Sequence, residues 1–150
     1  MLPAAKHFVA ITPISKTNGA TAGGTADLPI DTLGYDFMNL TVIASTADVV
    51  SNTLSVLLLK EADVTATSSM ANVSGSVGGT DFTIATNAYT STSNQNIWTY
   101  NVDLRGRKRY LRVYASPQTT MVMAAVASLY RGEQAPITAT KANALNVVSL

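Results

Sequence analysis

Apolar residues recur at every second position along much of this chain, and this period of two is the feature that most constrains its fold. In one such segment Met38, Leu40 and Val42 fall on one face, and Asn39 and Thr41 fall on the other. Such alternation is typical of a β-strand with one buried face. Apolar residues at the helical spacing i, i+3, i+4 and i+7 are almost absent outside the C-terminal tail. The sequence therefore predicts an all-β fold.

Six segments carry a strand pattern: residues 7–12, 35–45, 53–61, 97–104, 109–116 and 120–130. Pro13 is expected to end the first, and Phe82-Thr83-Ile84 is a further candidate within the polar residues 62–96. Short strands separated by turn residues predict an antiparallel two-sheet β-sandwich, for which a jelly roll is our favoured arrangement. The predicted core contains Leu40, Val42, Val56, Leu58, Val102, Leu111, Val113 and Val126.

The chain is expected to form one domain. Its 150 residues suffice for one hydrophobic core and are too few for two comfortable ones. Residues 1–33 are interpreted as an N-terminal strand and a flexible loop, and residues 137–150 as a C-terminal tail. An apolar terminus, Leu145-Asn146-Val147-Val148-Ser149-Leu150, needs a surface to pack on. That surface is either an edge of this domain's own sheets or a neighbouring subunit, so we expect extended terminal arms and a dimer or trimer.

Composition limits the classes of partner. Ten basic and nine acidic residues give a net charge of +1, which leaves no global field to attract nucleic acid or an anionic membrane. The opening residues 1–7 lack the pattern of a secretory signal, and the apolar runs are too short to span a bilayer. Charged residues make up 13% of the chain, against about 25% in an average protein. A surface rich in small and hydroxyl side chains suits tight contact with a partner.

No residue pattern indicates catalysis, a metal or another cofactor. His7 is the only histidine and cysteine is absent, so conventional residues cannot form a three-ligand zinc site. A Ser-His-Asp site would have to recruit His7 without a Gly-x-Ser-x-Gly turn. The carboxylates could pair for glycoside hydrolysis, although turn or surface roles fit them better; they include Asp36, Glu61, Asp63, Asp81 and Asp103. The expectation is a non-enzymatic protein.

Half of the basic residues lie in one short segment that is expected to be a hairpin. They are Arg105, Arg107, Lys108, Arg109 and Arg112. Gly106 is expected to supply the turn, and Asp103 to pair with one arginine. Three interpretations are open: docking on an acidic protein surface, a solvated hairpin, or a phosphate-binding patch where Tyr110 and Tyr114 stack on bases. Exposed pairs within one domain add too little stability to explain the clustering, which favours docking on protein.

Two arginine-glycine segments give the chain a resemblance to a known class of protein. They are Asp-Leu-Arg-Gly-Arg-Lys-Arg-Tyr-Leu-Arg-Val at 103–113 and Tyr-Arg-Gly-Glu-Gln-Ala-Pro at 130–136, joined by an Ala-rich strand and preceded by Ile-Asp-Thr-Leu-Gly-Tyr-Asp at 30–36. Over residues 28–136 this order resembles the capsid cement or decoration proteins of tailed bacteriophages. The resemblance implies a jelly-roll domain on the capsid exterior, assembled in the host cytoplasm, which ties major capsid subunits together. Arg131 would join the five clustered cations as an interface residue.

Other placements and one other class stay open. The protein could instead stand at the base of a head fibre or in the tail. A carbohydrate-binding module is the competing class, with Trp98 and Tyr89 as stacking residues. Trp98 shares a face with Tyr100, Val102 and Leu104, which favours a core role. The expected partners are the major capsid protein and further copies of this chain, with no membrane and no nucleic acid.

Overall fold

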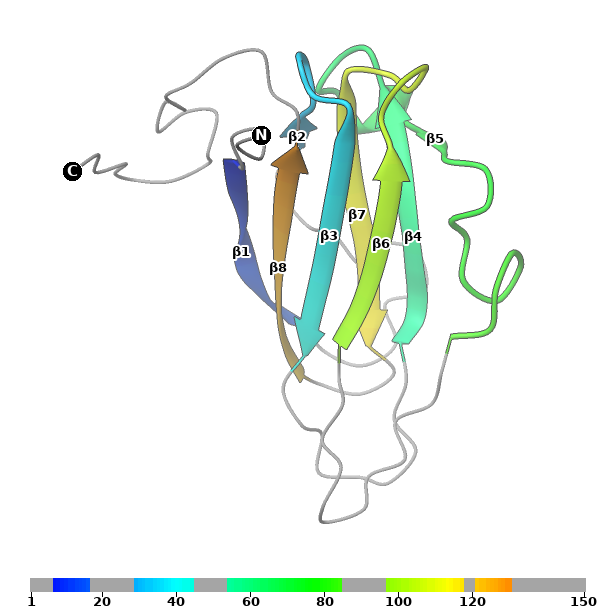
Figure 1. Cartoon of the computed structure of the whole chain (residues 1–150). Coiled ribbons are helices and arrows are strands. Elements are labelled where there is room, and N and C mark those ends of the chain that lie inside the picture. Colours follow the sequence, from blue (N-terminus) through cyan, green and yellow to red (C-terminus); the bar gives the residue numbers. More distant parts are fainter. Residues whose placement is uncertain (1–6, 17–28, 45–53, 85–96, 118–120, 131–150) are drawn as a thin grey trace, which may run out of the picture.

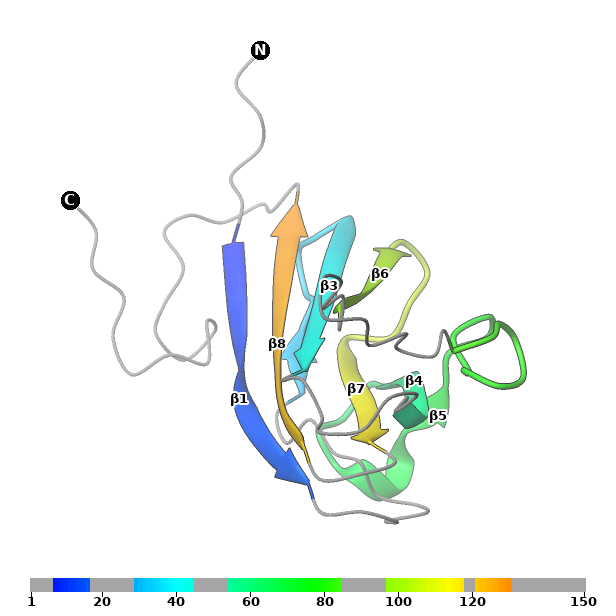
Figure 2. The ribbon, with the colours of Figure 1, turned by 90° about the horizontal axis from the view of Figure 1, so that it is seen from below.

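A computed structural model of the chain describes residues 7–16, 29–44, 54–84, 97–117 and 121–130. Two antiparallel sheets lie face to face as two layers (Figures 1 and 2). Sheet 1 has the order β1 (His7–Lys16), β8 (Met121–Tyr130), β3 (Phe37–Ala44) and β6 (Ile97–Asp103). Sheet 2 has the order β2 (Ile30–Asp31), β7 (Tyr110–Pro117), β4 (Leu54–Ala62) and β5 (Ala71–Asn72). The prediction of an antiparallel two-sheet β-sandwich is confirmed.

Strands from the two halves of the chain pair with each other. The pairs are β1 with β8, β2 with β7, β3 with β6 and β4 with β5, and the pairings of β3 with β8 and of β4 with β7 complete the sheets. Consecutive strands therefore alternate between the sheets, except that β4 and β5 are neighbours in sheet 2. The turn from β6 to β7 crosses from sheet 1 to sheet 2. These two strands therefore do not pair, and the prediction of a hairpin is wrong.

Each of the six predicted strand segments contains a strand, with two local corrections. Pro13 does not end β1, because a register shift between Ile11 and Ile14 admits it on an edge strand. The residues Phe82-Thr83-Ile84 do not form a strand, since Phe82 makes only an isolated bridge to Gly78. The polar stretch forms β5 instead, together with one short 3₁₀ turn at Thr67–Ser69. Within the predicted N-terminal region 1–33 the structure contains β1 and β2, while residues 17–28 and the predicted tail 137–150 lie outside the described residues.

The hydrophobic core lies between the two sheets and confirms part of the predicted set. Leu40, Val42, Leu111 and Val113 are almost completely buried, and Val102 packs against them while partly exposed. Alternation along β3 and β7 directs these side chains inward. The largest fully buried side chains are Ile30, Met38, Leu40, Leu54, Leu57, Leu59, Leu111, Met123 and Leu129.

The predicted inward faces of β4 and β8 are wrong. Leu57 and Leu59 enter the core, whereas Val56 and Leu58 are half-buried on the outer face of sheet 2. A register shift between Leu54 and Val56 changes the alternation at the start of β4. Val126 is 38% exposed on the outer face of sheet 1. Both errors arise where apolar side chains occupy consecutive positions, because such a run does not specify a face.

Leu59 tests this assignment of faces, with Val126 as a matched control. Leu59 is 1% exposed, so Leu59→Ala is expected to lower the free energy of unfolding by about 2–5 kcal/mol through lost burial and a cavity. Val126→Ala removes apolar atoms from an exposed position and is expected to cost about 1 kcal/mol or less. Chemical denaturation of both variants measures the difference. Equal losses would contradict the assignment.

Candidate functional site

Three connections between strands meet at one end of the sandwich, at the top of Figure 1. They are the β2–β3 turn, the segment after β4 and the β6–β7 turn. Four basic side chains at this end form ion pairs with four acidic ones, and we call it the charged end. Its members are Arg105, Arg107, Lys108, Arg109, Asp31, Glu61, Asp63 and Asp103.

The β6–β7 turn has a rigid base. Gly106 has a φ of 82°, a left-handed conformation that suits glycine, and this confirms its predicted role in the turn. The backbone N–H of Arg107 donates to the carbonyl of Leu104 at 3.0 Å. Leu104 is buried, and its N–H donates to the carbonyl of Asp36 at 2.8 Å. The turn is therefore anchored in the core while its cations stay exposed.

Two arginines are held by carboxylates in two-pronged contacts. Nε and Nη2 of Arg105 donate to Oδ1 and Oδ2 of Asp103 at 2.9 and 2.7 Å, which confirms the predicted local pairing of Asp103. Nε and Nη2 of Arg109 donate to Oδ1 and Oδ2 of Asp31 at 3.0 and 2.9 Å. Paired bonds of this kind fix the plane of the guanidinium group.

Glu61 and Asp63 pair with the remaining two cations. Nη1 of Arg107 lies 3.5 Å from Oε1 of Glu61, and Nζ of Lys108 lies 4.0 Å from Oδ2 of Asp63. Glu61 also accepts a hydrogen bond from the backbone N–H of Lys108 at 3.2 Å. The four cations thus face four carboxylates, and the positive patch expected from sequence is a mosaic of both signs. Sequence reasoning missed Asp31, Glu61 and Asp63 as members because they are distant along the chain.

Two predicted interface residues are not part of this exposed cluster. Arg112 is only 9% exposed, and its Nη1 donates to Oγ1 of Thr67 at 2.8 Å. It lies on the outer face of sheet 2 with Lys60 as its neighbour on β4. Its burial removes it from an exposed docking surface. Arg131 lies outside the described residues.

Exposed apolar side chains accompany the charges. Leu33 is 56% exposed at the β2–β3 turn, and Val64 is 51% exposed directly after Asp63. The N–H of Leu33 donates to Oδ1 of Asp31 at 3.1 Å, so the same carboxylate that holds Arg109 also shapes this turn. No repeated pattern in the sequence identifies these two residues, since single apolar residues on a surface are common.

Ion pairing also sets the protonation of the charged end. Hydrogen bonds from the Arg105 side chain and backbone lower the pKa of Asp103 to about 2. The bond to Asp103 raises the pKa of Arg105, and the bond to Asp31 raises that of Arg109. These three groups are therefore all ionised at neutral pH.

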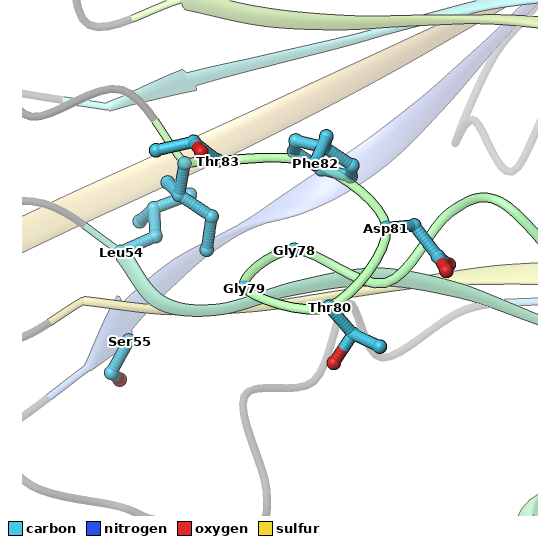
Figure 3. A pocket seen from close by; sticks show the side chains of 9 residues that line it. Leu54, Ser55, Gly78, Gly79, Thr80, Asp81, Phe82 and Thr83 are labelled. Carbon is cyan, nitrogen blue, oxygen red and sulfur yellow. The ribbon is translucent and has the colours of Figure 1, made fainter.

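A separate hollow of about 650 Å³ lies beside the loop that follows β5 (Figure 3). Its lining combines the start of β4 with residues 78–84, and the labelled Thr80 and Asp81 side chains point away from the loop. Gly78 is required here, because a Cβ atom would lie 2.5 Å from Cγ1 of Ile84. The Asp81 carboxylate is used locally, since Oδ2 accepts a hydrogen bond from the N–H of Val77 at 2.8 Å. These contacts explain a tight loop, and they do not assemble a nucleophile with a base.

Within the described ranges, no cluster of three or more His, Asp or Glu residues could hold a metal ion, and no helix is long and apolar enough to cross a bilayer. Comparison of the chain with protein-family models, curated proteins and solved structures finds no match. The interpretation of the charged end therefore rests on its own geometry and on the sequence resemblance.

Titration of Asp103 tests the geometry of the charged end. We expect its carboxyl group to titrate near pH 2 by ¹³C NMR, and Arg105→Ala to move this pKa up toward the ordinary value of 3.8 for an aspartate. Because the folded-state pKa is lowered, the stability that Asp103 contributes is present above about pH 4 and is lost as the pH falls through about 2. Arg109→Ala is the matched control, since Arg109 pairs with Asp31 instead. An unchanged Asp103 pKa in Arg105→Ala would contradict the assigned pair.

Proposed function

We propose that this protein is a non-enzymatic structural protein of a tailed-phage virion, which binds the outer capsid surface and bridges major capsid subunits. The observation that carries the proposal is the charged end. There the residues of the first arginine-glycine segment form an exposed turn. Its cations pair with Asp103 of the same segment and with Asp31, Glu61 and Asp63 from elsewhere in the chain. The resemblance of that segment to cement and decoration proteins supplies the class of partner.

We infer further that the strand order is that of a jelly roll. The chain pairs its first strand with its eighth, its second with its seventh, its third with its sixth and its fourth with its fifth. A ribbon of four such pairs, rolled into two sheets, is the arrangement expected of an eight-stranded jelly roll. This strand order supports the proposal because the resemblance implies a jelly-roll domain.

The ion pairs favour an interface role on energetic grounds. Exposed ion pairs in proteins contribute only about 0–1 kcal/mol each to folding, so pairs such as Arg105–Asp103 and Lys108–Asp63 add little stability. They do hold long side chains in fixed positions before a partner arrives, which reduces the entropy lost on binding. Because both signs are present, the best partner surface also offers both signs, and it places an apolar recess over Leu33. A purely acidic partner would have to compete with the protein's own carboxylates.

The fold bears on the two residues named for the competing carbohydrate-binding interpretation. Trp98 has Val42 as its cross-strand partner and packs against the core, so the expected core role of Trp98 is confirmed. Tyr89 lies outside the described residues. A stacking platform built on these two residues therefore has no support from the described part of the chain. Placement at a head-fibre base or in the tail remains an alternative within the proposed class.

Removing two cations of the charged end tests the proposal. The double variant Arg107→Ala, Arg109→Ala is expected to unfold at nearly the wild-type temperature, because Glu61 and Asp31 keep their hydrogen bonds from the backbone N–H groups of Lys108 and Leu33. Its occupancy on purified phage particles, measured as a ratio to the major capsid protein, is expected to fall. Wild-type binding is expected to weaken as salt rises, since exposed charges are screened.

Lys60→Ala serves as the control, because it removes a cation from the outer face of sheet 2 and leaves the charged end intact. Normal occupancy of the folded double variant would contradict the docking role and would show that the cluster is a solvated turn. Absence of the wild-type protein from particles in a fixed ratio would overturn the virion assignment itself.

A further inference from the structure

The outer face of sheet 1 is uncharged along most of its described length, and its described side chains are partly or fully exposed. Its rows run across β6, β3 and β8, because cross-strand partners share a face. One row consists of Thr99, Thr41 and Val126, and the next of Asn101, Asn39 and Ser128. The row nearest the charged end consists of Asp103, Phe37 and Tyr130. Polar amides thus lie directly beside two aromatic rings.

A hollow of about 380 Å³ lies at the aromatic end of this face. Its lining includes Phe37, Asn39, Asn101, Asp103 and Tyr130 from the outer face. The volume falls within the range of about 300–1,000 Å³ that is usual for small-molecule sites. A small ligand with both polar and apolar faces would therefore fit.

The two amides are already oriented. Nδ2 of Asn39 donates to Oδ1 of Asn101 at 2.8 Å, and Oγ1 of Thr41 donates to Oδ1 of Asn39 at 3.3 Å. No hydrogen bond involves the amide N–H₂ of Asn101 within the described part of the chain, and its side chain is exposed. The pair therefore offers free donors and acceptor lone pairs side by side. Hydroxyl groups, which donate and accept at once, match such a pair.

The side chains of Phe37 and Asp103, which lie beside the two amides, are also held in place. The guanidinium carbon of Arg105 lies 5.2 Å from the centre of the Phe37 ring, while the same guanidinium holds both oxygens of Asp103. Because Arg105 pairs with both oxygens of Asp103, this side of the hollow carries no net charge that would attract a phosphate or an acidic sugar. The half-buried rings of Phe37 and Tyr130 supply apolar surface for the C–H face of a sugar ring.

We propose that this hollow, which we call the amide–aromatic hollow, binds a neutral saccharide, with Asn39 and Asn101 bonding its hydroxyls and the aromatic pair contacting its ring. This function is separate from capsid binding, and it would let a shell-bound protein attach to neutral glycans. The sugar class follows from the lining, which combines adjacent amides, aromatic surface and a carboxylate that is already paired with Arg105.

Binding of the full chain to a panel of neutral oligosaccharides ending in glucose, galactose, mannose or N-acetylglucosamine tests the proposal. Amide chemical-shift changes in ¹⁵N NMR are expected to concentrate at residues 37–41, 99–103 and 126–130, with an affinity of about millimolar. Asn101→Ala is expected to weaken binding about tenfold or more, because the hydroxyl bonds are lost. Asn101→Asp, which keeps the shape and removes the N–H donors, is expected to act in the same direction.

Asn72→Ala is the matched control, since Asn72 is an exposed asparagine on β5 of sheet 2. No binding by the wild type to any sugar of the panel, binding confined to acidic sugars, or full binding by folded Asn101→Ala would each overturn the proposal. Capsid occupancy separates the two functions. Asn101→Ala is expected to keep wild-type occupancy on particles, and the Arg107→Ala, Arg109→Ala variant is expected to keep wild-type saccharide binding.

Discussion

The antiparallel pairing of β3 with both β6 and β8 is the constraint on which the rest of the molecule depends. It sets Met38, Leu40 and Val42 into the core and, on the alternate positions, Phe37 and Asn39 onto the open face. A slip of one residue would exchange the two faces, so burial of the core specifies this register strongly. The same pairing brings the ends of β6 and β8 to the start of β3. The amide–aromatic hollow and the adjoining turn are therefore consequences of how the core is buried.

The outer faces of the two sheets differ in which side chains they bury. Sheet 1 leaves polar side chains exposed together with Ile43, Ile97 and Val126, whereas sheet 2 buries Arg112, Tyr114 and Ser116 on its outer side. Nζ of Lys60 lies 4.7 Å from the centre of the Tyr114 ring, which is a favourable cation–π distance. Nε of Arg112 and the hydroxyl of Tyr114 are buried without a hydrogen-bond partner in the described part of the chain. Such groups cost stability, because a buried polar atom without a partner has lost its hydrogen bonds to water.

Short sequence patterns correctly predicted those features that depend on residues close together in the chain. Alternation identified the inward faces of β3, β6 and β7, and the sequence Asp103-Leu104-Arg105-Gly106 indicated both a glycine turn and a local ion pair. The patterns failed where consecutive residues are equally apolar, as in β4 and β8. They also failed for contacts between distant segments. Arg109 meets Asp31 across 78 positions, and Asn39 meets Asn101 across 62. Only the strand order creates these neighbours, so neither the charge mosaic nor the hollow could be read from the sequence.

Arg105 joins the two surfaces that the fold creates. One edge of its guanidinium bonds Asp103, which belongs to both the charged end and the hollow, and its carbon lies over the Phe37 ring. Loss of this side chain would free the Asp103 carboxylate and remove the cover from one side of Phe37. A substitution of Arg105 would therefore change the charged end and the amide–aromatic hollow at the same time. Arg107 and Arg109 instead pair with Glu61 and Asp31, which do not line the hollow. The structure thus places a charged contact surface beside a polar face, and only Arg105 and Asp103 are shared between them.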